Sequence, residues 1–294
     1  MIGELSGLGG AAAWAIISTM MRSVSERVSP VLVNALRCTF SAFTLVAALL
    51  LLGKGQDLVG MPPGNVAGLV VSGILGQAMG DAFFVRSMKL IGTSRALPIS
   101  SINPLITLIL AVLLLGERIT LLSLAGALLV LSGIYLLAFP YGPLGRMRDL
   151  LASADRGGIT MALAAALCWS ISTIILKQAL EGVDLLAAAC VRMSTAFLLM
   201  MTLELFQSGG KMPPGLSRRT MGIMALAGVI GGASTFMYLT AVSLAGAAKA
   251  SILVSTSPFF GLPLSLIFLR ERINSRVLLG TLITVVGIWM VLGG

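Results

Sequence analysis

Asp81 is a carboxylate that lies deep within an apolar stretch of the sequence, Gln77-Ala78-Met79-Gly80-Asp81-Ala82-Phe83-Phe84. A charge at the centre of a bilayer helix costs about 2.5–3.5 kcal/mol on insertion scales, so such a residue usually faces a cavity or a charged partner. Two interpretations follow. Asp81 either binds a substrate or couples transport to protons, or it forms a salt bridge with Arg37 or Arg95.

Two other apolar stretches carry proline directly after a polar residue, as Asn103-Pro104 and Ser257-Pro258. A proline within a helix removes one hydrogen bond and leaves the carbonyl four residues earlier without its usual donor. Opened backbone at membrane depth must line a cavity or be buried in protein. These prolines therefore indicate either cavity lining or helix kinks that neighbouring serines and threonines satisfy.

Aromatic side chains are few, and several lie inside the apolar stretches. Trp14 and Trp169 are ten or more residues into theirs, too deep for the interfacial belt, so they either pack helices or form a cavity wall. A buried Tyr238 hydroxyl needs a partner, which a substrate could supply. The candidate cavity residues are Trp14, Gln77, Met79, Asp81, Phe83, Ser100, Asn103, Pro104, Trp169, Tyr238, Ser257 and Pro258.

Arg37 and Arg192 occupy equivalent positions one to two turns into two of the stretches. Their duplication favours a structural role, as buried or snorkelling cations, over carboxylate recognition. Thr120 and Asn274 are predicted helix caps, and the Glu-Arg pairs before them are assigned no chemistry. Small residues at spacings of seven, or four plus three, predict close helix packing or a dimer contact at Gly126, Gly133, Gly280, Thr284 and Gly287.

The segments that hold these residues are apolar and long. The chain is 57% apolar and 11% charged, against about 25% charged in soluble domains. A helix needs about 20 residues to cross the hydrocarbon core. Ten segments fit, and they predict an all-α membrane protein: Leu5–Met21, Val31–Leu52, Val66–Met88, Ala96–Leu115, Leu121–Phe139, Ile159–Leu176, Leu185–Phe206, Met221–Ser243, Ala248–Leu269 and Val277–Leu292.

The chain is also duplicated. Trp14, Arg37 and Gly76 recur 155 positions later as Trp169, Arg192 and Gly231, and Pro104, Glu117 and Gly126 recur 154 positions later as Pro258, Glu271 and Gly280. Five segments per copy is an odd number, so the second copy must begin on the opposite side of the bilayer. We expect two inverted five-helix repeats, 1–140 and 158–294, joined by a loop at 141–157, around a central cavity of the kind that transporters use.

Several functions are disfavoured by absent patterns. The sequence has no phosphate-binding loop and no histidine, which argues against ATP-driven pumping and against histidine-based catalysis, so no enzyme is expected. Three cysteines without a C-x-x-C spacing give no metal site or disulfide framework, and no cofactor is predicted. The net charge of +9 is scattered over short connections, which disfavours nucleic-acid binding.

The same charges predict orientation. Fifteen of the 20 Lys and Arg residues fall at the first, third, fifth, seventh and ninth connections and the adjoining helix ends. The positive-inside rule places that side in the cytoplasm and both termini outside.

The doubled pattern resembles the EamA branch of the drug/metabolite transporter superfamily. The resemblance covers essentially the whole chain and rests on Ala13-Trp14, Leu36-Arg37, Asn103-Pro104 and Leu115-Gly116-Glu117-Arg118, with second copies at Trp169, Arg192, Ser257-Pro258 and Arg270-Glu271. It implies a ten-helix, inverted five-plus-five basket whose cavity is lined mainly by helices 1, 3, 4, 6, 8 and 9. The chain departs from the pattern at Arg270, where the first copy has Gly116, and its charge bias opposes the cytoplasmic termini usual in the family.

The resemblance also implies export or exchange of small metabolites at a bacterial inner membrane. The glycine- and methionine-rich third segment looks most like the aromatic and broad-range amino acid exporters, so the leading expectation is a secondary exporter of aromatic and other neutral amino acids. The alternative is a proton-coupled exporter of cationic drugs or other metabolites, with Asp81 as the coupling residue. A membrane enzyme or assembly factor would need a catalytic constellation that the sequence does not show. The expected partners are a small-molecule substrate and the lipid bilayer, with a monomer or a homodimer as the working unit.

Overall fold

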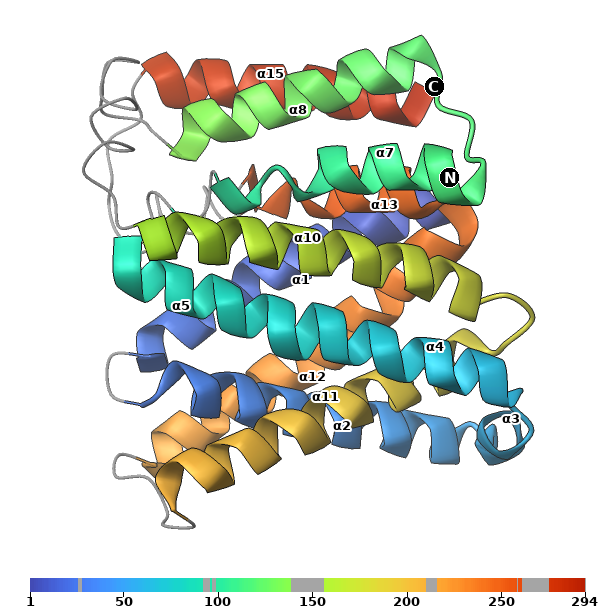
Figure 1. Ribbon diagram of the computed structural model, residues 1–294, viewed down its shortest axis with the longest axis vertical. Coiled ribbons are helices and arrows are strands. Elements are labelled where there is room, and N and C mark those ends of the chain that lie inside the picture. The colour runs from blue at the N-terminus through green and yellow to red at the C-terminus, as the bar shows by residue number, and fades with distance from the viewer. Residues whose placement is uncertain are drawn as a thin grey trace.

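The computed structural model describes residues 1–25, 28–91, 96, 99–138, 156–209, 216–257, 259–260 and 275–293. Throughout these residues the regular secondary structure is helical, without a strand. The helices lie side by side and run between the same two ends of the molecule (Figure 1). The predicted all-α fold is confirmed.

The described helices follow the predicted order. The first half contains α1 (Ile2–Ser25), α2 (Pro30–Leu51), the short α3 (Gly55–Val59), α4 (Pro63–Gly73), η1 (Ile74–Gly80), α5 (Asp81–Ile91), α7 (Asn103–Leu115) and α8 (Leu121–Ala138). The second half contains α10 (Arg156–Ala179), α11 (Leu185–Ser208), α12 (Arg218–Ala245), α13 (Ala247–Val254) and α15 (Ser275–Gly293). α4, η1 and α5 follow one another without a break and form the third crossing.

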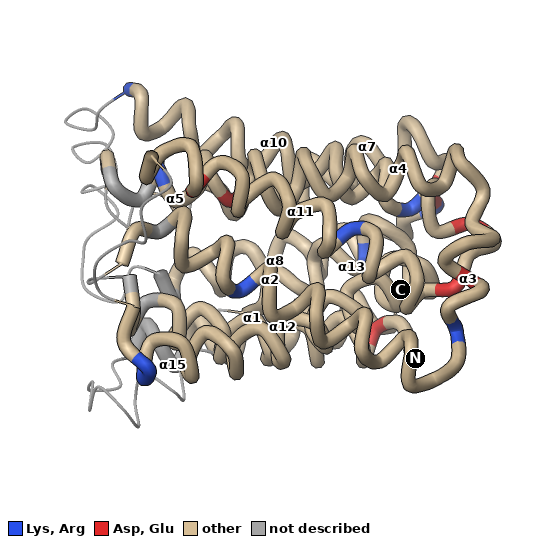
Figure 2. The backbone as a smooth tube through the Cα atoms, turned by 90° about the horizontal axis from the view of Figure 1, so that it is seen from below, with Lys and Arg blue, Asp and Glu red and all other residues tan. Residues whose placement is uncertain are grey.

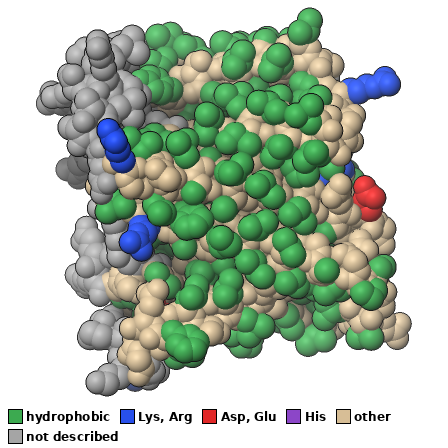
Figure 3. Space-filling model, viewed as in Figure 1, with side chains coloured by type: hydrophobic (Ala, Val, Ile, Leu, Met, Phe, Trp, Pro, Cys, Tyr) green, Lys and Arg blue, Asp and Glu red, His purple; other side chains and the backbone are tan. Residues whose placement is uncertain are grey.

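Length and surface agree with a multi-pass membrane protein. Five described segments are long and apolar enough to span a bilayer: Val31–Leu51, Pro63–Ser87, Arg156–Ala179, Leu185–Ser208 and Arg218–Ala245. Three shorter apolar helices accompany them, Asn103–Leu115, Leu121–Leu136 and Leu279–Gly293. Hydrophobic side chains cover the middle of the face in Figure 3, while the charged ones lie toward its margins. Because lipid tails satisfy no polar group, this is the surface that a bilayer selects.

The two halves are inverted relative to each other. Both termini lie at the right-hand end in Figure 1, where α1 begins, whereas α10 begins at the opposite end. Contacts between the halves are also repeated. α1 of the first half packs on α12 of the second, as α10 of the second half packs on α4, η1 and α5 of the first, and α2 packs on α11. Residues 141–155 of the predicted connecting loop lie outside the described residues, and its last two residues belong to α10. The exact repeat boundaries stay a prediction.

Polar caps set where several spans begin. Asp184 Oδ1 accepts hydrogen bonds from the backbone N–H groups of Leu186 and Ala187, at 2.9 and 3.0 Å, and its Oδ2 pairs with Lys54. Partial burial raises the pKa of the Asp184 carboxyl, but the Lys54 ammonium and the two N–H groups outweigh burial and hold that pKa below its usual value. Thr120 Oγ1 accepts from the Ser123 N–H at 3.0 Å, as predicted for a cap. Asn274 lies outside the described residues.

Glu117 joins the two halves near the end that holds the termini. Its two carboxylate oxygens accept hydrogen bonds from the backbone N–H groups of Ala247, at 2.7 Å, and Ala248, at 3.2 Å. These groups open α13, directly after Gly246, whose φ of 90° few side chains tolerate. A carboxylate at a helix N-terminus is favourable for both hydrogen bonding and the helix dipole. Glu117 therefore has a structural role.

The predicted small-residue stripe packs α8 against α15. A Cβ atom at Gly126 would lie 2.8 Å from the carbonyl oxygen of Gly287, and one at Gly287 would lie 2.7 Å from the Val130 nitrogen. These neighbours are backbone atoms, which cannot move aside as a flexible side chain could. The two helices are thus in direct backbone contact, as small residues in membrane helices allow.

The inversion predicts which positions share a side of the membrane. In a variant without the native cysteines, Ser23→Cys at the end of α1 and Glu181→Cys after α10 occupy equivalent connections of the two halves. We expect a membrane-impermeant maleimide to label them from opposite sides in sealed vesicles, because the second half is inverted. Labelling of both from one side would contradict the arrangement.

The α8–α15 contact predicts a large effect of one methyl group. We expect Gly287→Ala to destabilise the protein by about 1–3 kcal/mol, as overpacking does when neighbours cannot yield. Gly222→Ala in α12 is the matched control, because nothing lies within 4 Å of a Cβ atom built there. Thermal unfolding of the purified proteins in detergent measures both. Equal unfolding temperatures for the two variants would show that the helices separate at no cost.

Candidate functional site

A buried ion pair lies between the two halves. Most of the length of the bundle carries no charged residue (Figure 2). Arg37 on α2 and Asp81 at the start of α5 are exceptions, with Nη2 of the arginine 3.6 Å from Oδ2 of the carboxylate. The Arg37 side chain is 2% exposed and the Asp81 side chain 17%. Of the partners that the sequence offered Asp81, Arg37 is the one that the structure brings to it, and Arg95 lies outside the described residues.

Each member of the pair is held by further contacts. The Asn34 side-chain oxygen accepts from Arg37 Nε at 3.1 Å and from Nη2 at 2.8 Å, and the guanidinium carbon lies 5.4 Å from the centre of the Trp14 ring. On the other side, Trp169 Nε1 donates to Asp81 Oδ1 at 3.1 Å. The two equivalent tryptophans therefore contact opposite members of one ion pair. Helices from both halves meet there.

The position of Asp81 depends on η1 and its glycines. η1 is a seven-residue π-helix that ends directly before Asp81, and π-helical turns inside membrane helices frequently occur at functional sites. A Cβ atom at Gly80 would lie 2.6 Å from the Trp169 ring. Glycine at position 80 therefore lets the tryptophan approach the backbone closely enough to reach the carboxylate.

Arg192, the equivalent of Arg37, has a different environment. Its Nη2 donates to Ser172 Oγ at 3.2 Å, and its guanidinium carbon lies 5.7 Å from the centre of the Tyr238 ring. The Tyr238 hydroxyl is in turn 2.6 Å from Thr173 Oγ1. Arg192 is 4% exposed, and its Nε has no hydrogen-bond partner among the described residues. In the described part of the chain, Gln77 Oε1 is a second buried side-chain atom without a hydrogen-bond partner.

The fourth and ninth crossings both break where the prolines were noted. α7 begins only at Asn103, after a turn at residues 101–102, so the buried Pro104 occupies its first turn instead of kinking a continuous helix. Asn103 Oδ1 accepts from Ser170 Oγ at 2.8 Å and from Thr107 Oγ1 at 3.1 Å. α13 ends at Val254, before a turn, and Pro258 lies outside the described residues.

The structure thus joins some predicted residues and leaves others apart. Trp14, Asp81, Trp169 and Gln77 lie at or beside the ion pair, and Tyr238 lies at Arg192. Ser100 is buried, Phe83 and Ser257 are half-buried, and Met79 is 39% exposed, without a described contact to either arginine. The central cavity itself stays a prediction.

Sequence reasoning missed Asn34, Ser172 and Thr173, and it treated the two arginines as structural. A signal was present, because Asn34 lies three residues before Arg37, and Ser172 and Thr173 lie three and four residues after Trp169. Residues at those spacings share a helix face.

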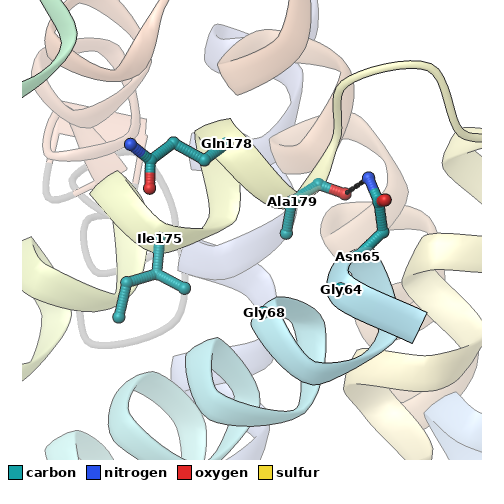
Figure 4. A pocket seen from close by; sticks show the side chains of 6 residues that line it. All are labelled: Gly64, Asn65, Gly68, Ile175, Gln178 and Ala179. Carbon is teal, nitrogen blue, oxygen red and sulfur yellow. Dashed lines mark hydrogen bonds between the residues drawn. The ribbon is translucent and has the colours of Figure 1, made fainter. Parts of the chain in front are cut away.

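A pocket of about 170 Å³ lies elsewhere, where α4 crosses α10 (Figure 4). It is lined by Gly64, Asn65, Gly68, Ile175, Gln178 and Ala179. The Asn65 amide donates to the carbonyl oxygens of Ala179, at 3.1 Å, and Glu181, at 3.0 Å. Since the Asn65 amide is bonded to the backbone and none of the predicted cavity residues lines this pocket, we place the functional site at the arginines.

The fold and the buried charges define a multi-pass membrane transporter. Residues 1–139 and 156–293 each match the EamA-like transporter family, so the chain belongs to this family. An uncharacterised transporter of Archaeoglobus fulgidus is 26% identical over 227 residues, 76% of this chain and 75% of that protein. The pseudopaline exporter CntI of Pseudomonas aeruginosa is 32% identical over 143 residues, 49% of this chain and 47% of that protein.

A crystal structure of a protein 20% identical to this chain superposes with a TM-score of 0.79, over 98% of this chain and 96% of that one. This similarity shows a shared fold.

The buried ion pair predicts strong energetic coupling. We expect Arg37→Gln and Asp81→Asn each to cost about 3–5 kcal/mol, because either leaves one charge buried without its partner. The double variant should cost less than the sum of the two. Unfolding in mixed detergent and SDS micelles measures the four proteins of the cycle.

The Lys54–Asp184 pair, in which the lysine side chain is 43% exposed, provides the control cycle, through Lys54→Gln and Asp184→Asn. We expect a much weaker coupling there, because solvent screens the two charges. Coupling of equal size in the two cycles would show that burial adds nothing to the Arg37–Asp81 interaction.

Proposed function

We propose that this chain is a secondary transporter that exports small metabolites, chiefly aromatic and other neutral amino acids, across the bacterial inner membrane by alternating access. The observation that carries the proposal is the Arg37–Asp81 pair between Trp14 and Trp169. It combines both charge signs with aromatic surface at one buried place between inverted halves.

The chemistry of the site suits an amphiphilic zwitterion. Arginine side chains recognise carboxylates, and carboxylate or amide oxygens accept hydrogen bonds from an ammonium group. The aromatic surface is extended by Phe84, whose ring centre lies 5.3 Å from that of Trp169. Small-molecule sites commonly combine a mostly apolar wall with a few such polar groups. Varied side chains would be accepted by this wall, so we expect broad selectivity.

The relatives support export of a small metabolite. CntI, the partial relative, is named as an exporter of pseudopaline. Inverted halves give a chain two conformations of similar energy, open to opposite sides of the membrane. Together these support alternating access without a nucleotide-binding unit in this chain.

One observation favours the second candidate, a proton-coupled exporter of cations. Asp81 is the more exposed member of its pair, at 17% against 2% for Arg37. However, its two oxygens already face Arg37 and the Trp169 N–H group. A cationic ligand would have to displace an arginine, which makes the zwitterion the better fit.

Counterflow in proteoliposomes tests the function. We expect vesicles loaded with unlabelled phenylalanine to accumulate labelled phenylalanine, and a panel of the twenty amino acids to compete to differing degrees. Should none of the twenty move while a quaternary ammonium compound is transported against a proton gradient, the second candidate replaces the first.

Asp81→Asn tests coupling in the same vesicles. If Asp81 carries protons, this variant should lose its dependence on a pH gradient, because an amide cannot exchange a proton there. Asp57→Asn on the exposed α3 is the matched control. Unchanged dependence in both variants would exclude Asp81 as the proton carrier.

A further inference from the structure

The two equivalent arginines differ in how their charge is balanced. Arg37 has Asp81 as a counter-ion at 3.6 Å, together with two hydrogen bonds to Asn34. Among the described residues, Arg192 directly contacts the neutral Ser172 hydroxyl and the face of the Tyr238 ring, while Asp81, which is paired with Arg37, acts on it as a more distant charge. No carboxylate in the described part of the chain lies within 4.0 Å of the Arg192 guanidinium. Its Nε has no hydrogen-bond partner there either, although the residue is only 4% exposed.

The chain does not supply a counter-ion at the position where symmetry would put one. The residue equivalent to Asp81 is Phe236. A guanidinium stays protonated, so a buried one without an anion is costly unless something else provides the charge. An aromatic face offsets part of this cost, but it leaves the N–H groups in need of acceptors.

Gly76 of η1 packs directly against Arg192, where no larger residue would fit. A Cβ atom at Gly76 would lie 3.1 Å from Arg192 Nη2 and 2.5 Å from Ser172 Oγ. Gln77, the next residue of η1, carries the unpartnered acceptor Oε1. Among the described residues, one buried donor, Arg192 Nε, and one buried acceptor, Gln77 Oε1, therefore lack a partner, and Arg192 contacts η1 at Gly76, the residue next to Gln77.

We propose that Arg192 binds the carboxylate of the transported molecule and that Gln77 accepts a hydrogen bond from a donor group of the same molecule, such as its ammonium. This deepens the proposed function, on which it rests, by making the carboxylate obligatory. The substrate class is then carboxylates with an apolar or aromatic body that packs near Tyr238. Arg37 is the less suitable anchor, because its carboxylate partner is already built into the chain.

Access to Arg192 comes with the alternation between conformations. The side chain is buried between α11, α10 and η1 here, and α10 and η1 belong to opposite halves. A relative movement of the halves separates these elements and exposes the guanidinium, and closure around the substrate buries it again.

The test uses three ligands that differ in their charged groups: phenylalanine, phenylalaninamide, which lacks the carboxylate, and 3-phenylpropionate, which lacks the ammonium. Tryptophan fluorescence of the purified, full-length protein in detergent reports binding. For the wild type we expect both carboxylates to bind with a Kd at least about tenfold lower than that of the amide, from the loss of a charge-assisted hydrogen bond.

Arg192→Gln should bring the acid and the amide to within about twofold of each other, because the charged donor is gone. Arg192→Lys keeps the charge but not the fork of donors, and it should retain part of the discrimination. Arg218→Gln, which removes an exposed arginine at the start of α12, is the matched control and should behave as the wild type. If Arg192→Gln does not purify as a monodisperse protein, the test rests on Arg192→Lys, which should show a smaller ratio of acid to amide affinity than the wild type.

The inference is overturned if the wild type binds the amide as well as the acids, if neither carboxylate binds, or if the Arg192 variants keep the wild-type ratio. Its failure is distinct from that of the proposed function. If phenylalanine is transported but the Arg192 variants keep the wild-type ratio of acid to amide affinity, only the inference about Arg192 fails. If 3-phenylpropionate binds through Arg192 but phenylalanine is neither bound nor transported, only the assignment of amino acids as substrates fails.

Discussion

The burial of two permanent positive charges is the constraint on which this architecture depends. An arginine cannot release its proton to escape a low-dielectric environment, so the surrounding helices must provide acceptors, opposite charge or aromatic faces. Arg37 and Arg192 are 2% and 4% exposed. Glycines on the facing helices make the room, since a Cβ atom at Gly231 would lie 3.7 Å from Arg37 Nη1 and one at Gly76 would lie 3.1 Å from Arg192 Nη2. Each half thus accommodates the arginine of the other.

The similarity of the two repeats accounts for the scaffold, and a difference between them accounts for the candidate site. The repeats place arginine, tryptophan and glycine at equivalent positions, and the matching helix contacts keep the halves similar enough for two conformations. Asp81 against Phe236 is where the copies diverge. Arg37 is in direct contact with a carboxylate, whereas Arg192 contacts none among the described residues, so an ion pair lies beside an arginine without a direct counter-ion. A duplicated scaffold that only filled the membrane would gain nothing from that difference.

The sequence predicted the elements better than it predicted their contacts. Apolar length, the repeat offset and the odd number of crossings were enough for the helices and for the inversion. Glycine spacing was enough to predict close packing at Gly126 and Gly287, but not that α8 and α15 pack on each other. The sequence could not choose between Arg37 and Arg95 as the partner of Asp81, because that choice depends on how α2 and α5 are placed in space. It also gave no sign of the π-helix at Ile74–Gly80, which packs against α10, and it noted Pro104 without predicting that a helix begins at Asn103.

The geometry of the ion pair argues for a role in movement over one in stability. At 3.6 Å the Arg37–Asp81 contact is longer than a hydrogen bond between charged groups, and buried pairs often stabilise a fold no better than apolar residues would. The pair connects α2 to α5, while Trp169 ties Asp81 to α10 in the other half. η1 lies beside both arginines, through Gly76 at Arg192 and through the Gln77 carbonyl, 3.5 Å from the Asn34 amide that faces Arg37. A displacement of this one π-helical segment therefore changes the surroundings of both charges at once, which is what a site that alternates between two conformations requires.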